Sequence, residues 1–242
     1  MPMSTEHTHL NPHISRQFSN ELEDVRRKVL AMGGLVEEQL AVALRVLTDG
    51  DARLGAEVTA REEQINAAEI EIDSQCTQIL ARRQPAASDL RLVLTVMKML
   101  GDIERIGDEA KRIERIAEGL VGEDSHGEEP TAALAGLGVQ ARDMLRGALD
   151  AFARLDERLA LDVIRRDRRI DARYRDLLAL LTDRMRQTPD AIPRELERLW
   201  AARSLERVGD RCKNLCEYVL YLVRGKDVRH TGLARNEDPA AE

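Results

Sequence analysis

Helical periodicity is the feature of this sequence that most constrains its fold. From near Phe18 onward, apolar residues recur at three- and four-residue spacing for most of the 242-residue chain. This spacing is typical of amphipathic α-helices, and few residues that break helices interrupt it. Hydrophobic residues make up 43% of the chain and aromatic residues only 2%, so we expect a core of aliphatic side chains. The pattern predicts an all-α protein.

Four short polar segments divide the periodic pattern. They are "TDGD" (48–51), "RQPAASD" (83–89), "GEDSHGEEPT" (122–131) and "TPDAIP" (188–193). The third segment holds two glycines and a proline, which makes it the best linker candidate. We therefore expect six long helices, three on each side of the linker. The expected ranges are a flexible N-terminal tail (1–14), a first three-helix bundle (15–121), the linker (122–131), a second three-helix bundle (132–226) and a flexible C-terminal tail (227–242).

The two halves repeat one pattern. A shift of 105 residues places Leu40 on Leu145, Leu44 on Leu149 and Ile65 on Ile170. Beyond the second break the shift becomes 102, and a shared motif E-R-[IV]-G-D aligns Glu104, Arg105, Gly107 and Asp108 with Glu206, Arg207, Gly209 and Asp210. Helical periodicity alone does not produce a four-residue identity at equivalent places. We interpret the chain as a tandem duplication of a three-helix unit.

Each copy of the motif contains two acidic residues four positions apart, with a glycine between them. Residues with this spacing lie on one face of a helix. A like-charge pair there costs roughly 0.2–0.5 kcal/mol, and an interior glycine costs about 1 kcal/mol relative to alanine. Both costs recur at the same register in both halves. The glycine would also let another backbone or a ligand come close to the helix.

Two interpretations of these acids stay open. In the first, the acids form an oxygen-rich binding site for a cation such as Mg²⁺, Mn²⁺, iron or Zn²⁺. Its ligands would be Glu104, Asp108, Glu206 and Asp210. Alternatively, nearby basic side chains neutralise them, and the available ones are Arg105, Lys111, Arg112, Arg203, Arg207 and Lys213. The first interpretation makes the chain a metal-responsive or metal-buffering helical protein.

An arginine-rich run, "RRDRRIDARYR", spans residues 165–175. It is the best local candidate for a surface that docks an acidic partner, a phosphate or a membrane surface. The arginines concerned are Arg165, Arg166, Arg168, Arg169, Arg173 and Arg175. Two aspartates interrupt the run, so a solvated helix face is the alternative.

Several functional classes are disfavoured. The chain has no phosphate-binding loop, nucleotide-binding fingerprint or nucleophile elbow, and all five histidines lie in the expected tails or linker. It is therefore not expected to be an enzyme, and a di-iron site built from Glu-x-x-His pairs is excluded. The net charge of −7 argues against nucleic-acid binding, and no apolar run is long enough for membrane insertion.

The cysteines and the N-terminal histidines have simple interpretations. The cysteines are odd in number and lack the spacing of a disulfide framework, which favours a reducing, cytoplasmic compartment. Cys212 and Cys216 fall on the expected core face, where a free cysteine acts as a small hydrophobe, although metal or redox roles stay open. His7, His9 and His13 are expected in a flexible tail that can pick up transition metals adventitiously.

The motifs resemble those of one family, the PhoU phosphate-signalling proteins. The residues that carry the resemblance are "AMGGLVEEQL" (31–40) and "ARRQPAASDLRLVLTVMKMLGDIERIGDEA" (81–110) in the first half. In the second half they are "DAFARLDE" (150–157) and "ARSLERVGDRCKNLCEYVLYLVRG" (202–225). The similarity runs from about His13 to His230, nearly the full length.

The resemblance implies a fold, a role and partners. It implies two pseudo-symmetric three-helix bundles, a cytoplasmic homodimer, and a negative regulator of the phosphate regulon. It also implies two partners, the PstB ATPase of the high-affinity phosphate ABC transporter and the sensor histidine kinase PhoR. The family's E(D)xxxD metal motifs map onto the two acid pairs. A family asparagine corresponds to Asn214, but Arg112 stands at the equivalent first-half position, where we expect it to weaken or replace metal binding.

Overall fold

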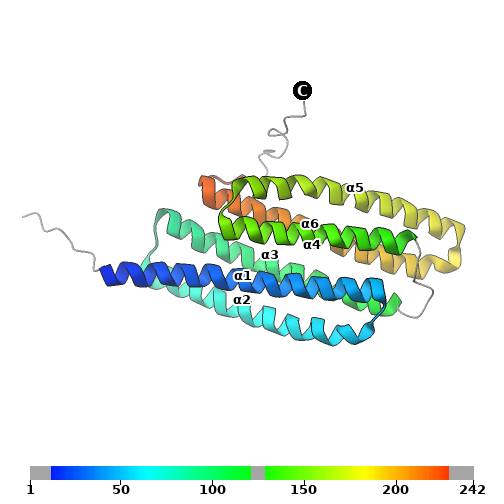
Figure 1. The fold of residues 1–242 in the computed structure, drawn as a ribbon, viewed down its shortest axis with the longest axis horizontal. Helices are drawn as coiled ribbons and strands as arrows, with labels where there is room; N and C mark the ends of the chain where they lie inside the picture. The colour runs from blue at the N-terminus through cyan, green and yellow to red at the C-terminus, as the bar shows by residue number, and fades with distance from the viewer. Residues whose placement is uncertain (1–11, 121–128, 229–242) are drawn as a thin grey trace, which may run out of the picture.

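The computed structural model describes residues 12–120 and 129–228 and is almost entirely helical there (Figure 1). This part contains six α-helices and two short 3₁₀ turns. They are α1 (Pro12–Asp49), η1 (Ala52–Leu54), α2 (Gly55–Arg83), α3 (Ala87–Leu120), α4 (Glu129–Arg154), α5 (Glu157–Gln187), η2 (Pro189–Ala191) and α6 (Ile192–Arg224). The predicted all-α class with six long helices is confirmed.

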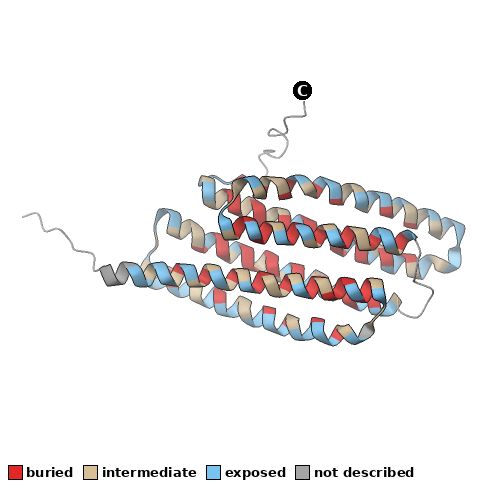
Figure 2. Cartoon of the chain, viewed as in Figure 1, coloured by how far each residue is buried: buried red, intermediate tan, exposed pale blue. Residues whose placement is uncertain are grey.

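The helices form two three-helix bundles that pack side by side. α1, α2 and α3 contact one another in the first bundle, as do α4, α5 and α6 in the second. The bundles meet through α1 against α4 and α3 against α6, which leaves α2 and α5 on opposite outer edges (Figure 1). Buried residues are dense along the four inner helices and sparser on α2 and α5 (Figure 2). One continuous hydrophobic core therefore runs through both bundles.

The contact between α1 and α4 is reciprocal. A Cβ atom added at Gly33 would collide with the side chain of Leu149, and one added at Gly138 would collide with Leu44. Both pairs are equivalent under the 105-residue shift, because 33 aligns with 138 and 44 with 149. Each glycine thus accommodates a leucine of the other bundle. This reciprocity is the structural counterpart of the sequence duplication.

Two helix starts differ from the expected ranges. α1 begins at Pro12 rather than near Phe18, and α4 begins at Glu129, inside the expected linker. Proline is compatible with the first turn of a helix, because the amide it lacks has no partner there. Pro12 and Pro130 therefore lie in the first turns of helices, and His13, which was expected in the flexible tail, lies in α1. The rest of the linker and most of both tails, with His7, His9, His126 and His230, lie outside the described residues.

The last helix ends at a glycine. Gly225 adopts a left-handed conformation with φ of 71°, and its backbone N–H donates to the carbonyl of Tyr221. Just before this end, Cys212 and Cys216 are fully buried, as is Cys76 in α2, which confirms the core interpretation. Burial raises the pKa of the Cys212 thiol well above its ordinary value, so it is poorly reactive. None of the helices in the described ranges is apolar over a length that could cross a membrane.

Candidate functional site: two acidic clusters

The first acid pair lies on α3, facing the outer helix α2. Glu104 is partly buried and Asp108 exposed, and two further acids, Glu62 and Glu69, approach them from α2. Burial raises the pKa of Glu104, and the charges of Asp108, Glu69 and Glu62 raise it further. The pKa of Asp108 is raised by burial and then by Glu62. The four carboxyl groups therefore form one mutually repelling cluster, called here the first acidic cluster.

Gly107 lets polar side chains of α1 and α2 reach the backbone of α3. A Cβ atom at this position would lie 3.1 Å from Gln39 Oε1 and 3.8 Å from Glu62 Oε2. The buried Gln39 amide donates from Nε2 to Glu62 Oε2 at 2.8 Å, while its Oε1 has no hydrogen-bond partner among the described residues. The glycine thus makes room for neighbouring side chains beside the acid pair. The sequence had suggested that another backbone or a ligand would come close there.

The second acid pair repeats this arrangement on α6. Glu206 and Asp210 face α5, which contributes Asp167 and Asp171. Burial raises the pKa of Glu206, and the charges of Asp210 and Asp171 raise it further against the opposing effect of Arg203. A Cβ atom at Gly209 would lie 3.1 Å from Ile170 Cδ1 and 3.7 Å from Asp167 Oδ1. These four acids form the second acidic cluster.

Arginine and lysine neutralise only part of these clusters. Arg203 pairs with Glu206, but Arg207 donates instead to Glu109 on α3 at 2.9 Å. Arg105 lies 3.6 Å from Asp102. In residues 12–120 and 129–228, no basic atom lies within 4.0 Å of the carboxylates of three predicted site residues, namely Glu104, Asp108 and Asp210. Among the four, Glu206 alone forms an ion pair, while the charges of Arg105 and Lys111 lower the pKa of Glu104 and of Asp108 from a longer distance.

The clusters differ in one basic contact. Lys213 Nζ lies 3.0 Å from Asp167 Oδ2, whereas the equivalent Lys111 Nζ lies 3.9 Å from Glu62 Oε1. The guanidinium of Arg112 contacts α6 instead, with Cζ 5.4 Å from the centroid of the Trp200 ring. The first cluster therefore has less compensation from nearby cations than the second.

The donor atoms suit a hard cation, although they do not converge on one point. Among the described residues, no three Asp, Glu, His or Cys side chains are grouped so that they could hold an ion as they stand. Three oxygens in or beside the clusters have no hydrogen-bond partner there: Gln39 Oε1, Asp167 Oδ1 and Glu206 Oε2. Carboxylate and amide oxygens are the ligands that Mg²⁺ and Mn²⁺ prefer. Rotation of these side chains would be needed to bring them onto an ion.

The motif E-R-[IV]-G-D reveals only half of each cluster. The partners on the outer helices, Glu62 and Glu69 on α2 and Asp167 and Asp171 on α5, were not predicted as site residues. A signal was present, since the repeat aligns Glu62 with Asp167, and an isoleucine follows each of them at the same spacing. Asp167 and Asp171 are also the two aspartates that interrupt the arginine-rich run.

The arginine-rich run lies on α5, beside the second acidic cluster. Arg165, Arg168, Arg169, Arg173 and Arg175 are exposed or partly exposed, and Arg166 is partly buried and pairs with Asp162. Arg175 donates from Nε to the backbone oxygen of Asp171 at 3.2 Å. The face is accessible, and its docking role stays a prediction.

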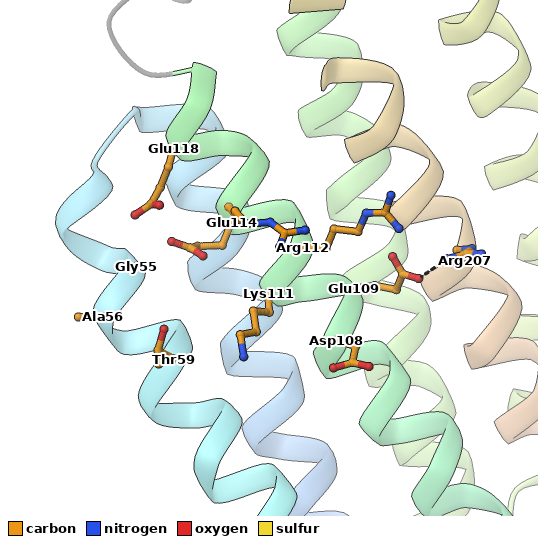
Figure 3. A pocket seen from close by; sticks show the side chains of 11 residues that line it. Gly55, Ala56, Thr59, Asp108, Glu109, Lys111, Arg112, Glu114, Glu118 and Arg207 are labelled. Atoms are coloured by element: carbon orange, nitrogen blue, oxygen red, sulfur yellow. Dashed lines mark hydrogen bonds and ion pairs between the residues drawn. The ribbon is translucent and has the colours of Figure 1, made fainter. Parts of the chain in front are cut away.

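A charged pocket adjoins the first cluster (Figure 3). It has a volume of about 720 Å³ and extends from Asp108 along α3, between α2 and α6. Glu114 and Glu118 point from α3 toward Gly55 at the start of α2, and Glu109 points to Arg207 on the other side (Figure 3). Burial raises the pKa of Glu114, and the neighbouring Glu118 raises it further.

Comparison with known proteins identifies the family of the chain. The family model of the PhoU domain matches twice, over residues 29–117 and 134–219, one match in each bundle. The chain belongs to the PhoU family. It is 49% identical over 231 residues to the phosphate-specific transport system accessory protein PhoU homolog of Pseudomonas aeruginosa, covering 95% of this chain and 94% of the relative. It is 42% identical over 224 residues to the PhoU accessory protein of Escherichia coli, covering 92% of each chain.

Solved structures agree with the sequence comparison. The crystal structure of PhoU from Pseudomonas aeruginosa matches with a TM-score of 0.83 at 47% identity, covering 86% of this chain and 100% of that one. The phosphate transport system regulatory protein PhoU from Streptococcus pneumoniae matches with a TM-score of 0.80 at 29% identity, covering 87% and 99%. The names of these relatives describe accessory and regulatory proteins rather than enzymes, in agreement with the sequence prediction.

Proposed function

We propose that this chain is a negative regulator of the phosphate regulon and of phosphate uptake. It acts as a cytoplasmic adaptor that couples the high-affinity phosphate ABC transporter, through its PstB ATPase, to the sensor histidine kinase PhoR. The observation that carries the proposal is the near full-length match to accessory proteins of phosphate-specific transport. Long helices with charged outer faces and two repeated clusters suit a protein that acts by contact.

The test is repression of alkaline phosphatase in phosphate-replete cells. A strain without this gene is expected to express the enzyme constitutively, and the native gene is expected to restore repression. Normal repression in the deletion strain would contradict the regulatory role. Pull-down of PstB and PhoR by the purified chain then examines the adaptor step, because a regulator that meets neither protein acts by another route.

We also propose that the two acidic clusters bind cations and that the protein works as a homodimer. Three predicted site acids lack a basic partner within 4.0 Å among the described residues, and a bound cation would relieve the repulsion between them. The test is metal content, measured by mass spectrometry, of the native chain and of a variant with Glu104, Asp108, Glu206 and Asp210 changed to alanine. Equal metal content in the two proteins would contradict binding at the clusters. Light scattering with and without Mn²⁺ reports the oligomeric state.

The same variant separates the adaptor from the alternative of a metal-buffering protein. If the folded variant restores repression in the deletion strain, the adaptor does not require the clusters. If it fails while the native gene succeeds, the clusters take part in signalling. A metal-buffering protein predicts altered tolerance of the cells to manganese or iron, with phosphatase repression unchanged by deletion.

A further inference from the structure

A half-exposed tryptophan lies beside two arginines where α3 meets α6. Trp200 is the only tryptophan of the chain, and 49% of its surface is exposed. The guanidinium of Arg112 lies over its ring. A groove of about 320 Å³ opens between the two helices beside this pair. Its lining consists of Arg112, Arg115, Ile116, Gly119, Glu197 and Trp200.

An apolar stripe extends from Trp200 along α6. Ile192, Leu196 and Trp200 are 39%, 40% and 49% exposed, and their four-residue spacing places them on one face of the helix. Single exposed apolar residues are common, but a contiguous stripe of large ones marks an interaction surface. Tryptophan and arginine are also the residues that most often dominate the binding free energy of protein interfaces.

The charge of this surface opposes that of the whole chain. The net charge is −7, yet the groove lining holds two guanidinium groups against one carboxylate. Nearby, Arg203 and Arg207 are engaged by Glu206 and Glu109. Within residues 12–120 and 129–228, no carboxylate lies within 4.0 Å of the guanidinium of Arg112 or Arg115. The charge of Arg115 lowers the pKa of Glu114 from a longer distance, so neither arginine is held in an ion pair that an incoming anion would have to break.

We propose that this groove docks an acidic segment of a partner protein. Carboxylates of the segment pair with Arg112 and Arg115, and an apolar side chain of the segment packs on Trp200 and Leu196. The groove lies between two helices, and its volume of about 320 Å³ accommodates side chains of a peptide segment. The identity of the partner rests on the proposed adaptor role, since the segment would belong to a protein that the adaptor contacts.

Trp200 reports occupancy directly, because no other tryptophan contributes to the fluorescence. The full chain is titrated with a synthetic amphipathic peptide of leucine and glutamate, and with the same peptide carrying lysine in place of glutamate. We expect a saturable blue shift with the acidic peptide only. Arg112→Glu with Arg115→Glu, and separately Leu196→Ser, should weaken binding by about tenfold or more. Arg82→Glu, a single charge reversal near the end of α2 and about 40 Å along that helix from its start, should leave binding unchanged.

Other results overturn the proposal. An equal shift with the lysine peptide, or undiminished binding by the folded charge-reversal variant, removes the charge complementarity. A shift with phosphatidylglycerol vesicles but not with the acidic peptide assigns the surface to a membrane. A shift that follows protein concentration without peptide assigns it to a second copy of the chain. The peptide titration does not depend on phosphate regulation. Intact repression of alkaline phosphatase in deletion cells would therefore contradict the adaptor role and leave the measured peptide binding unchanged.

Discussion

At the scale of single residues, the two acidic clusters share the inner acid pair and one equivalent outer acid, and they differ in the cations nearby. Lys213 approaches Asp167 to 3.0 Å in the second cluster, while Lys111 stays 3.9 Å from Glu62 in the first. An ammonium group close to the carboxylates lowers the attraction of a site for a metal cation. We therefore expect the first cluster to bind a cation more tightly than the second. The sequence alone predicts the reverse, because it places Arg112 beside the first acid pair, but the guanidinium of Arg112 lies over Trp200 instead.

We predict that Mn²⁺ binds more tightly at the first cluster. Asp108→Asn should weaken the strongest site several-fold in isothermal titration calorimetry, and Asp210→Asn should affect only the weaker site. Lys213→Met should strengthen the second site, because it removes the competing ammonium. The measurement uses protein with His7, His9 and His13 changed to alanine, so that these histidines do not contribute. Equal losses from the two asparagine variants would contradict the inequality.

Two glutamates, the buried Glu114 and the paired Glu21, should respond to pH in opposite directions. Burial and Glu118 raise the pKa of Glu114, so the folded state holds its proton more tightly than the unfolded state. Its contribution to stability therefore falls as pH rises above the unfolded value of about 4.3. Arg83 lowers the pKa of Glu21 in the folded state. The contribution of Glu21 to stability is therefore present above about pH 4.3, the unfolded value, and is lost as pH falls.

The corresponding variants test these signs. At pH 7, Glu114→Gln should raise the free energy of unfolding by about 0.5 kcal/mol, the size of a relieved like-charge pair. Glu21→Gln should lower it by a similar amount, because it removes a partner of Arg83 at 2.6 Å. Urea unfolding at pH 7 and pH 4 measures both, and both differences should shrink at pH 4. A loss of stability in Glu114→Gln at pH 7 would show that the carboxylate is favourable where it lies.

At the scale of helices, glycines decide how closely the two bundles approach. Gly33 and Gly138 each face a leucine of the opposite bundle. At Gly34, the next residue on α1, a Cβ atom would have no neighbouring atom within 4 Å. Helix propensity favours alanine over glycine by about 1 kcal/mol at all three positions. Only at the first two must an added methyl group also displace a packed side chain.

We predict opposite effects for adjacent substitutions. Gly33→Ala and Gly138→Ala should each destabilise the protein by about 1–3 kcal/mol, the usual cost of overpacking. Gly34→Ala should stabilise it by up to about 1 kcal/mol. Thermal unfolding monitored by circular dichroism gives all three values. Similar stability changes at positions 33 and 34 would mean that α1 and α4 do not meet as closely as described.

At the scale of the whole molecule, the two bundles share one core and a buried polar link. Asp102 on α3 accepts hydrogen bonds from Arg211 at 3.2 Å and from the hydroxyl of Tyr218 at 2.9 Å, both on α6. The second-half equivalent of Asp102 is Ser204, so the link breaks the internal symmetry. It joins the bundles in addition to the continuous hydrophobic core.

We predict that the chain unfolds in a single cooperative transition. Trp200 fluorescence reports α6 of the second bundle together with its contact with α3, and thiol labelling of Cys76, resolved by mass spectrometry, reports the first bundle. Both should change at the same urea concentration. Asp102→Ala should lower the free energy of unfolding by about 1–3 kcal/mol, since Tyr218 and Arg211 lose a buried partner. Two separate midpoints in the native chain would show that the bundles fold independently.

Much of this organisation is contained in the sequence itself. Apolar spacing determines the six helices, because an amphipathic helix must bury one face wherever it packs. The duplication determines the two bundles, and the repeated E-R-[IV]-G-D motif identifies α3 and α6 as the helices that carry the acid pairs. These properties follow from local spacing or from the comparison of two segments of the sequence. They can therefore be inferred without knowing which helices are in contact.

Tertiary structure alone decides which side chains complete the clusters. Glu62 and Asp167 join acids about forty residues away, and Lys213 selects Asp167 instead of Asp210. Arg112 turns to Trp200, although the sequence places it one turn from Asp108. A helical pattern specifies the face on which a residue lies, but not the helix that it meets. Contacts between helices therefore determine the charge of each cluster and the surface left open at Trp200.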